Sequence, residues 1–252
     1  KHIPFRKLCC LKRAAFTVPR MIPKEEQVFT EPAKTIGKTE FLVTYTSGTT
    51  NVPKGVVHTF GSLAKSIGLI SNLIGNPEGQ RLATHLPHFV LLGICSALPV
   101  HLWKYPMSAA KRLGFIENHQ ITMLFGPPCE YLELMQECKK QNRKLPESLS
   151  HILIGSAPVR AAFLNKLIPY LPKTTRITCL YGMTENLVVS TIDGREKVDY
   201  DCHGDVLGKI IDGSKIQFAR DGEILIQSNQ LFARYFHQKK RPAWHATGDL
   251  GY

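Results

Sequence analysis

The sequence predicts an α/β domain built on a layered parallel sheet, followed by a short β-rich segment toward the C-terminus. Helical patterns alternate with short apolar strands, with helices at 109–118, 130–141 and 159–170 and strands at 121–125, 151–154 and 177–181. This alternation is typical of parallel sheets with right-handed crossovers. Two further short strands, at 215–218 and 223–226, flank an Arg-Asp-Gly turn and predict the β-rich segment.

The composition of the 252 residues is that of an ordinary globular chain, with 43% hydrophobic and 21% charged residues. The longest apolar run, at 89–100, is too short to span a bilayer. Seven cysteines form no Cys-x-x-Cys pair, and their odd number argues against a disulfide framework. We therefore expect a cytoplasmic protein. Cys202-His203 alone would be only half of a metal site.

A hydroxyl-rich loop follows an apolar, β-branched run at 41–45 that is typical of a strand. The loop has hydrogen-bonding hydroxyls and flexible glycines: Thr46, Ser47, Thr49, Thr50, Gly48 and Gly55. Lys54 adds a positive charge, so the loop suits a polyphosphate. It is not a Walker loop, because Gly55 follows the lysine where that motif needs Gly before it. The alternative is an ordinary Ser/Thr/Gly-rich turn. A helix is expected behind the loop, at 61–74.

The predicted parallel strands are followed by residues that should converge, because ligands of such sheets bind beyond the carboxyl ends of the strands. Gly126 follows the first of these strands. The second strand is followed by Gly155, Ser156, Ala157 and Pro158, and the third leads into Tyr181, Gly182, Met183, Thr184 and Glu185. An aromatic face suits a purine, and a carboxylate suits magnesium.

The loop at 45–56, the Tyr-Gly-Met-Thr-Glu stretch at 181–185 and Thr-Gly-Asp at 247–249 resemble, in this order, the signatures of the adenylate-forming superfamily. Its members are acyl-CoA synthetases, luciferases and peptide-synthetase adenylation domains. The resemblance covers 41–252 and is greatest to fatty-acyl synthetases, including the olefin-pathway β-lactone synthetases. Asn51 stands where the family usually has Gly, and Asn tolerates a left-handed backbone.

The resemblance implies ATP and Mg²⁺ as cofactors, with coenzyme A as a further candidate. Tyr181 would stack on adenine, the 155–158 backbone and Gly182-Met183 would line the nucleotide, and Asp249 would accept hydrogen bonds from the ribose. Lys54 and Thr184 would contact phosphate, and Glu185 would bind Mg²⁺.

The resemblance also places a carboxylate pocket near His88, Phe89 and Gly126. The more usual family spacing would put its His at position 90, where this chain has Val90. A hydrogen-bonded core or surface role for His88 is the alternative.

The resemblance implies ATP-dependent activation of a carboxylic acid, first of all a fatty acid, to an acyl-adenylate with transfer to a thiol. The alternatives are β-lactone synthesis and a non-catalytic nucleotide-binding fragment. We expect a basic helical segment and connector at 1–40, an α/β nucleotide-binding region at 41–210 and a β-rich segment at 211–252. Because the resemblance ends at residue 252, we expect the stretch at 1–252 to lack the hinge and the mobile C-terminal domain of the family.

The charge of the chain is uneven. Residues 1–24 supply seven positive charges and no acid toward a net charge of +12. Apolar residues interleave with these charges, so the segment could touch an anionic membrane surface. A solvated helix face is the alternative, and no nucleic acid is expected as a partner.

Overall fold

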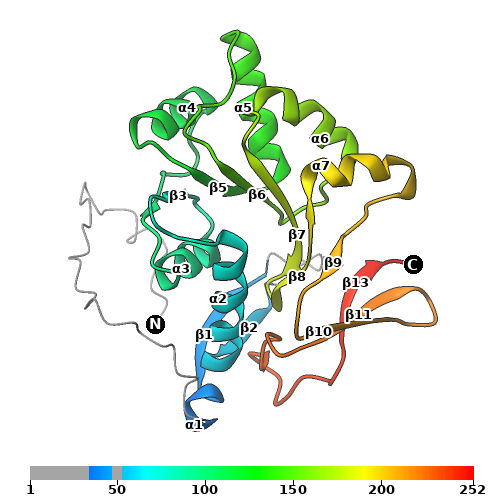
Figure 1. Cartoon of the computed structure of the whole chain (residues 1–252). Coiled ribbons are helices and arrows are strands. Elements are labelled where there is room, and N and C mark those ends of the chain that lie inside the picture. The colour runs from blue at the N-terminus through cyan, green and yellow to red at the C-terminus, as the bar shows by residue number, and fades with distance from the viewer. Residues whose placement is uncertain (1–33, 47–52) are drawn as a thin grey trace. The chain divides into compact units, whose positions relative to one another are not determined.

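Figure 1 shows the chain as a computed structural model, which describes residues 34–46 and 53–252, with the backbone alone described at 34, 35 and 201–203. These residues belong to the compact unit Pro32–Tyr252, and their strands form three sheets. The predicted basic segment at 1–24 lies outside the described residues. The predicted boundaries after 40 and 210 stay predictions.

The largest sheet has seven strands in the order β4-β3-β5-β6-β7-β8-β9. Its first five strands are parallel to their neighbours, whereas β8 and β9 are antiparallel. The strands are β3 (Leu82–Ala83), β4 (Val100–His101), β5 (Met123–Gly126), β6 (His151–Ile154), β7 (Arg176–Met183), β8 (Asn186–Asp193) and β9 (Lys209–Ile210). The parallel part confirms the predicted α/β class.

Helices cover both faces of this sheet (Figure 1). Leu124 packs in the core under α4, α5 and α6, whereas its neighbours Met123 and Phe125 pack in the core under α2 and α3. This alternation arises because successive side chains of a strand point to opposite faces. The helices are α1 (Lys34–Gly37), α2 (Phe60–Ile74), α3 (Pro87–Cys95), α4 (Ala109–Asn118), α5 (Pro128–Lys140), α6 (Ala161–Leu167) and α7 (Gly194–Lys197), with short 3₁₀ helices at Ile168–Tyr170 and Val198–His203.

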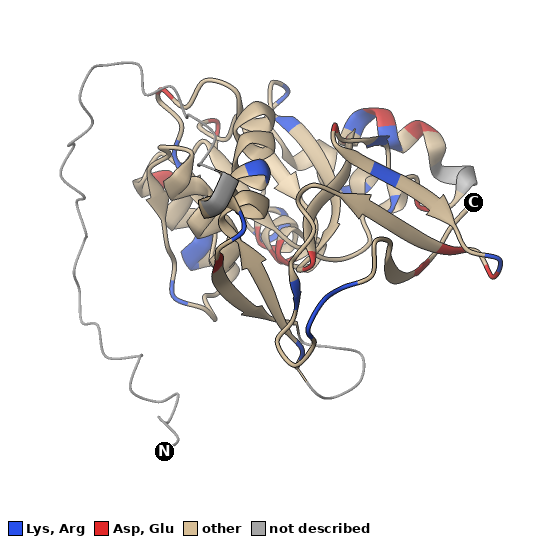
Figure 2. Cartoon of the chain, turned by 90° about the horizontal axis from the view of Figure 1, so that it is seen from below, with Lys and Arg blue, Asp and Glu red and all other residues tan. Residues whose placement is uncertain are grey.

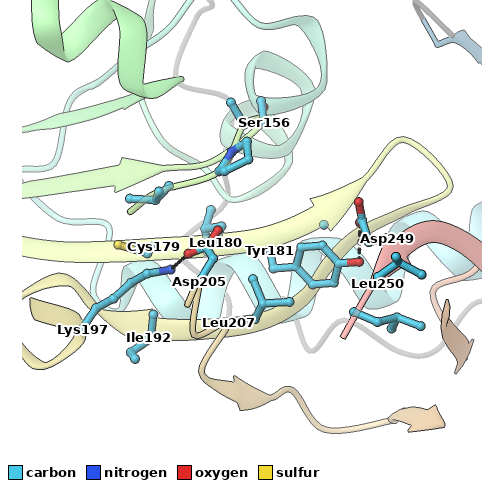
Figure 3. Close-up of a pocket in the computed structure, with 15 residues that line it drawn as sticks. Ser156, Cys179, Leu180, Tyr181, Ile192, Lys197, Asp205, Leu207, Asp249 and Leu250 are labelled. Atoms are coloured by element: carbon cyan, nitrogen blue, oxygen red, sulfur yellow. Dashed lines mark hydrogen bonds and ion pairs between the residues drawn. The ribbon is translucent and has the colours of Figure 1, made fainter. Parts of the chain in front are cut away.

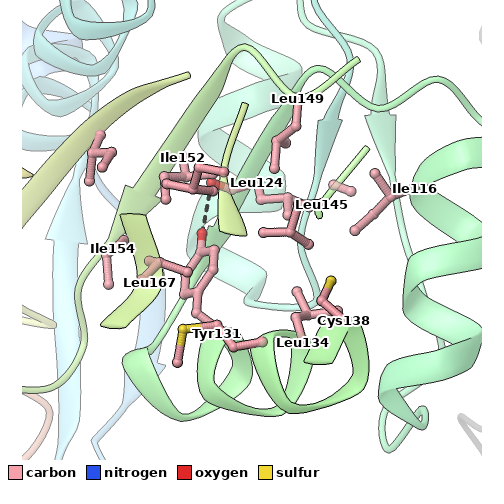
Figure 4. Close-up of a cluster of buried hydrophobic side chains, with 14 of the residues drawn as sticks. Ile116, Leu124, Tyr131, Leu134, Cys138, Leu145, Leu149, Ile152, Ile154 and Leu167 are labelled. Atoms are coloured by element: carbon pink, nitrogen blue, oxygen red, sulfur yellow. Dashed lines mark hydrogen bonds between the residues drawn. The ribbon is translucent and has the colours of Figure 1, made fainter. Parts of the chain in front are cut away.

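The core under α4, α5 and α6 includes the polar hydroxyl of Tyr131 (Figure 4). The ring is buried, and the hydroxyl donates toward the carbonyl oxygens of Leu124 at 3.2 Å and Leu153 at 3.1 Å. A buried phenol is stable there because its hydrogen bond is satisfied. The contact fixes α5 against β5 and β6, whose carboxyl ends point toward the site.

Two smaller antiparallel sheets carry the other predicted motifs. One has the order β1-β2-β12 and the other β10-β11-β13. Their strands are β1 (Glu40–Tyr45), β2 (Gly55–Thr59), β12 (Arg234–Tyr235), β10 (Ser214–Phe218), β11 (Glu223–Ser228) and β13 (His245–Leu250). The expected strands at 41–45, 215–218 and 223–226 are thereby confirmed. The hydroxyl-rich loop joins β1 to β2, which pair antiparallel.

Helix α2 begins directly after β2, and its start explains why the chain turns there. Thr59 is the N-cap: its hydroxyl accepts a hydrogen bond from the Ser62 amide at 3.1 Å, and Ser62 Oγ accepts one from the Thr59 amide at 3.1 Å. This reciprocal capping box satisfies two amides that the helix leaves unpaired. Ile70 and Ile74 then bury one face against the sheet, as the periodicity predicts.

Three features differ from the sequence-based expectations. The helix expected at 159–170 is divided into α6 and a 3₁₀ turn, where Pro169 lacks an amide donor. Residues 87–95, expected only as a pocket-lining stretch, form helix α3. The strand that follows 181–185 returns antiparallel as β8.

Charged residues of both signs are spread over the described helices, strands and loops (Figure 2). Within the described part of the chain, we find no helix with the length and apolar character needed to cross a membrane.

Candidate functional site

The loop after β6 meets the end of β7, as the carboxyl-edge rule predicts. Ser156 adopts φ 63°, a left-handed conformation that turns the chain away from the sheet before α6. A Cβ on Gly155 would lie 3.1 Å from the Leu180 carbonyl oxygen, so the absence of a side chain lets β6 and β7 approach closely. The loop and Tyr181 therefore border the same space.

That space is a cavity of about 350 Å³ (Figure 3), a size within the range of small-ligand sites. Six of the predicted site residues line it: Ser156, Ala157, Pro158, Tyr181, Gly182 and Asp249. They come from the loop after β6, from β7 and from β13, so two sheets contribute. Lys197, Asp205 and Leu207 also line the cavity and were not predicted.

Tyr181 and Asp249 are joined across the two sheets (Figure 3). The tyrosine hydroxyl donates a hydrogen bond to Asp249 Oδ2 at 2.7 Å. Burial, and then this hydrogen bond to a carboxylate, raises the pKa of Tyr181. The phenol therefore stays a neutral donor, and it orients the carboxylate while Asp249 Oδ1 remains available as an acceptor for a ligand.

Cys179 also lines the cavity. Burial raises the pKa of its thiol to about 12. A neutral thiol is a poor nucleophile, so the cavity is suited to binding rather than to cysteine chemistry.

Glu185, Lys54 and Tyr235 gather at a second place, around β12. Glu185 is only 9% exposed, and the hydroxyl of Tyr235 donates to its Oε1 at 2.8 Å. Lys54 Nζ lies 5.6 Å from the centroid of the Tyr235 ring. Burial, followed by the contact with Glu185, raises the pKa of Tyr235, which keeps it protonated. The structure thus brings together a cation and an acid that the sequence separates widely.

Thr184 lies beside this group and meets His58 of β2. The backbone of Thr184 hydrogen-bonds the His58 ring, and His58 Nε2 lies 3.3 Å from Thr44 Oγ1. Burial, and then the nearby His88, lowers the pKa of His58 to about 4. Burial also lowers the pKa of His88. Both rings are therefore neutral and able to accept as well as donate hydrogen bonds.

The three residues predicted for a carboxylate pocket occupy different surroundings. His88 is half-buried, and its Nε2 has no hydrogen-bond partner among the described residues. Phe89 is buried and stacks on Phe125, with the ring centroids 3.2 Å apart. Gly126 faces Glu130, whose Oε2 would lie 3.1 Å from a Cβ there. Their role in substrate binding stays a prediction.

The predicted phosphate loop is described only in part. Thr46 is described and its amide donates to the Lys54 carbonyl oxygen at 3.1 Å, which closes the loop at its base. Ser47, Gly48, Thr49 and Thr50 lie outside the described residues. Met183 packs against the cluster of Val189, Ile224 and Ile226 and does not line the cavity.

The sequence matches the family model described as AMP-binding enzyme over residues 8–236. The chain belongs to the AMP-binding enzyme family. This membership confirms the resemblance to the adenylate-forming superfamily.

Relatives of this AMP-binding chain include ligases and synthetases of about twice its length. The 2-succinylbenzoate–CoA ligase of Bacillus subtilis is 27% identical over an alignment of 233 residues, and the match covers 82% of this chain and 45% of the relative. The olefin beta-lactone synthetase of Stenotrophomonas maltophilia is 31% identical over an alignment of 170 residues, and the match covers 65% of this chain and 30% of the relative. The chain thus spans less than half of either relative.

A solved structure agrees with the fold of this AMP-binding chain. The o-succinylbenzoate coenzyme A synthetase of Bacillus subtilis, solved in complex with ATP and a magnesium ion, gives a TM-score of 0.69 at 26% identity. The match covers 83% of this chain and 47% of that chain.

Among the described residues of the AMP-binding chain, Glu185 is the carboxylate that the resemblance assigns to magnesium. No cluster of three or more His, Cys, Asp or Glu residues is found in 34–46 and 53–252. Glu185 remains, and its one described side-chain partner donates to Oε1, which leaves Oε2 available. Mg²⁺ commonly binds through one or two carboxylates together with water and substrate phosphates. Glu185 fits that kind of site.

Proposed function

We propose that the chain carries the nucleotide site of an enzyme that activates a carboxylic acid with ATP, releases pyrophosphate and passes the acyl group to a thiol such as coenzyme A. One observation carries this proposal. Tyr181 and Asp249, from two different sheets, meet in a cavity bordered by the 156–158 loop. The relative solved with ATP and a magnesium ion supports the choice of nucleotide and metal.

Tyr181 and Asp249 have distinct parts in the proposed nucleotide binding. The Tyr181 ring offers an aromatic face to a purine. The Asp249 carboxylate, oriented by the Tyr181 hydroxyl, accepts hydrogen bonds from sugar hydroxyls. These contacts fix the base and the sugar, so the phosphates are held in one direction.

The group around β12 provides the charge on the phosphate side. In the proposed reaction a carboxylate oxygen attacks the α-phosphorus and pyrophosphate leaves. Lys54 stabilises the negative charge that develops, and Glu185 would hold a metal ion. A bound Mg²⁺ would neutralise phosphate charge. The backbone of Thr184 is held by His58, and its hydroxyl would contact the phosphates.

A fatty acid is our proposed substrate. The resemblance of the 181–190 stretch to fatty-acyl synthetases supports this choice, and the 2-succinylbenzoate relative makes an aromatic acid the natural comparison. Formation of a β-lactone is the second candidate, because the olefin beta-lactone synthetase reaches 31% identity.

The test is ATP–pyrophosphate exchange with fatty acids of several lengths and with 2-succinylbenzoate, followed by addition of coenzyme A. We expect exchange with at least one acid and its loss in Lys54→Ala. Lys173→Ala, a change of an exposed lysine beyond α6, is the matched control. Binding of AMP without exchange for any acid would leave a non-catalytic nucleotide-binding module and overturn the enzymatic proposal.

A further inference from the structure

A buried ion pair lines the same cavity as Tyr181. Lys197 Nζ lies 2.5 Å from Asp205 Oδ1. The side chain of Lys197 is 4% exposed and that of Asp205 is 28% exposed, so the acid is the member of the pair that a ligand can reach. Neither residue belongs to a motif that the proposed function uses.

The position of the pair relates it to one end of a bound nucleotide. Figure 3 shows Lys197 and Asp249 at opposite ends of the drawn residues, with Asp205 and the Tyr181 ring between them. In the proposed function Asp249 binds the sugar and Tyr181 covers the base. The Lys197–Asp205 pair then faces the edge of the base that is distant from the sugar.

We propose that Asp205, held in place by Lys197, selects adenine by accepting a hydrogen bond from its exocyclic amino group. The inference rests on the proposed function, because it assumes that the cavity binds a nucleotide. It assigns to Asp205 the role of a specificity-determining residue and to Lys197 the role of a positioning residue.

The geometry favours adenine over guanine. A carboxylate that reads guanine uses both oxygens, one for each of two adjacent N–H groups. Here Oδ1 of Asp205 is paired with Lys197, which leaves Oδ2 as the available acceptor. One acceptor matches the single amino group on the corresponding edge of adenine.

The alternative is that the pair only ties α7 to the loop after the 3₁₀ helix at Val198–His203. A buried ion pair is weak support for a stabilising role, since desolvation of the two charges offsets much of their attraction. A purely structural pair would not change its effect with the base that is bound. Discrimination between bases therefore separates the two interpretations.

The experiment measures dissociation constants of the full chain for AMP, for purine riboside monophosphate, which lacks the amino group, and for IMP, which has an oxygen there. We expect the unaltered protein to bind AMP about tenfold more tightly than the other two, since a hydrogen bond to a charged group is worth about this factor. In Asp205→Asn the preference for AMP should disappear. The affinity for IMP should rise, because the Asn amide can donate a hydrogen bond to the oxygen that IMP has in place of the amino group.

Two further variants keep the test decisive. Asp199→Asn changes an exposed acid of the 3₁₀ helix that lies between Lys197 and Asp205 in the sequence. This variant should retain the AMP preference. The double variant Lys197→Met/Asp205→Leu removes both charges without leaving one buried alone, and it should bind AMP and purine riboside monophosphate equally.

The outcomes are distinguishable. An unchanged AMP preference in both Asp205 variants would overturn the assignment and leave the pair structural. Equal binding of the three nucleotides by the unaltered protein would also overturn it, while the proposed nucleotide site would stand. If the unaltered protein bound none of them, the proposed function itself would fail, and the inference with it.

Discussion

Glu185 is a buried carboxylate with one oxygen still available to a cation. It is largely buried at the β7–β8 turn, yet only one oxygen is engaged, by the hydroxyl of Tyr235. Burial of a charged group is unfavourable unless it is paired. A metal ion and the nearby Lys54 would both supply the missing positive charge.

Glu185→Gln should raise the Mg²⁺ concentration needed for half-maximal activity while leaving thermal stability nearly unchanged. The amide keeps the shape and can still accept from Tyr235, but it lacks the negative charge that Mg²⁺ prefers. A magnesium titration of pyrophosphate exchange measures the effect. Glu147→Gln, a change of an exposed acid before β6, is the control. Superimposable titrations of Glu185→Gln and the unaltered protein would show that this carboxylate does not hold the metal.

His58 makes stability depend on pH. Its pKa of about 4 in the folded protein lies below the ordinary value of 6.5, first because of burial and then because of His88. Between these values the unfolded chain binds a proton that the folded protein does not. Stability from this group is therefore complete above pH 6.5 and falls as the pH is lowered toward 4.

His58→Gln should weaken that dependence. The free energy of unfolding, measured by urea denaturation across the window from pH 6.5 to 4, should fall less steeply in the variant than in the unaltered protein. The exposed His237 gives the control His237→Gln, whose slope should stay as in the unaltered protein. Equal slopes for all three proteins would mean that the His58 ring is not buried as the structure shows it.

The β7–β8 hairpin is the element that presents the predicted motif. Met183 pairs with Asn186, so Thr184 and Glu185 form the turn itself. A Cβ on Gly182 would overlap the carbonyl oxygen of Leu187, which is backbone and cannot rotate away. The glycine therefore permits the close return of β8, and this return sets the direction of Glu185.

Gly182→Ala should destabilise the protein by about 1 to 3 kcal/mol and reduce pyrophosphate exchange, because the hairpin must open to admit the methyl group. Gly114→Ala is the matched control: a Cβ there meets nothing within 4 Å, and in the middle of α4 alanine should stabilise by up to about 1 kcal/mol. Chemical denaturation measures both. Equal stability of the two variants would contradict the hairpin geometry.

Helices and strands whose apolar residues recur with a clear period could be predicted from the sequence. Elements that depend on tertiary contacts could not. The helix at Ala109–Asn118 and the strand at His151–Ile154 have the expected bounds. The antiparallel strand β8 was missed, because the turn before it contains no Gly, Pro or Asn to signal a hairpin.

The residues of the candidate site also fall into those that the sequence predicted and those that it did not. Ser156 and Tyr181 could be predicted from the carboxyl-edge rule, since each follows or ends a parallel strand. Asp249 was predicted only from the order of the three family motifs along the sequence. Lys197 and Asp205 follow an antiparallel strand, where that rule says nothing. Tyr235 was missed because its partner Glu185 is distant in sequence.

At the scale of the described chain, the cavity beside Tyr181 lies between two sheets. β7 belongs to the seven-stranded sheet and β13 to the sheet β10-β11-β13, and the Tyr181–Asp249 hydrogen bond joins them. A ligand in this cavity contacts both sheets at once. Binding should therefore stabilise the folded state as a whole rather than one strand.

AMP should raise the free energy of unfolding by about 2.7 kcal/mol at a concentration one hundred times its dissociation constant. In Asp249→Asn the same AMP concentration should stabilise by only about 1.4 kcal/mol if affinity falls tenfold, because an amide oxygen is a weaker acceptor for sugar hydroxyls than a carboxylate. The Asn side chain can still accept from Tyr181, so the variant should unfold normally without AMP. Asp221→Asn, at the exposed turn between β10 and β11, keeps the full AMP effect if the cavity is the binding site. Equal AMP stabilisation of the two variants would place the nucleotide elsewhere.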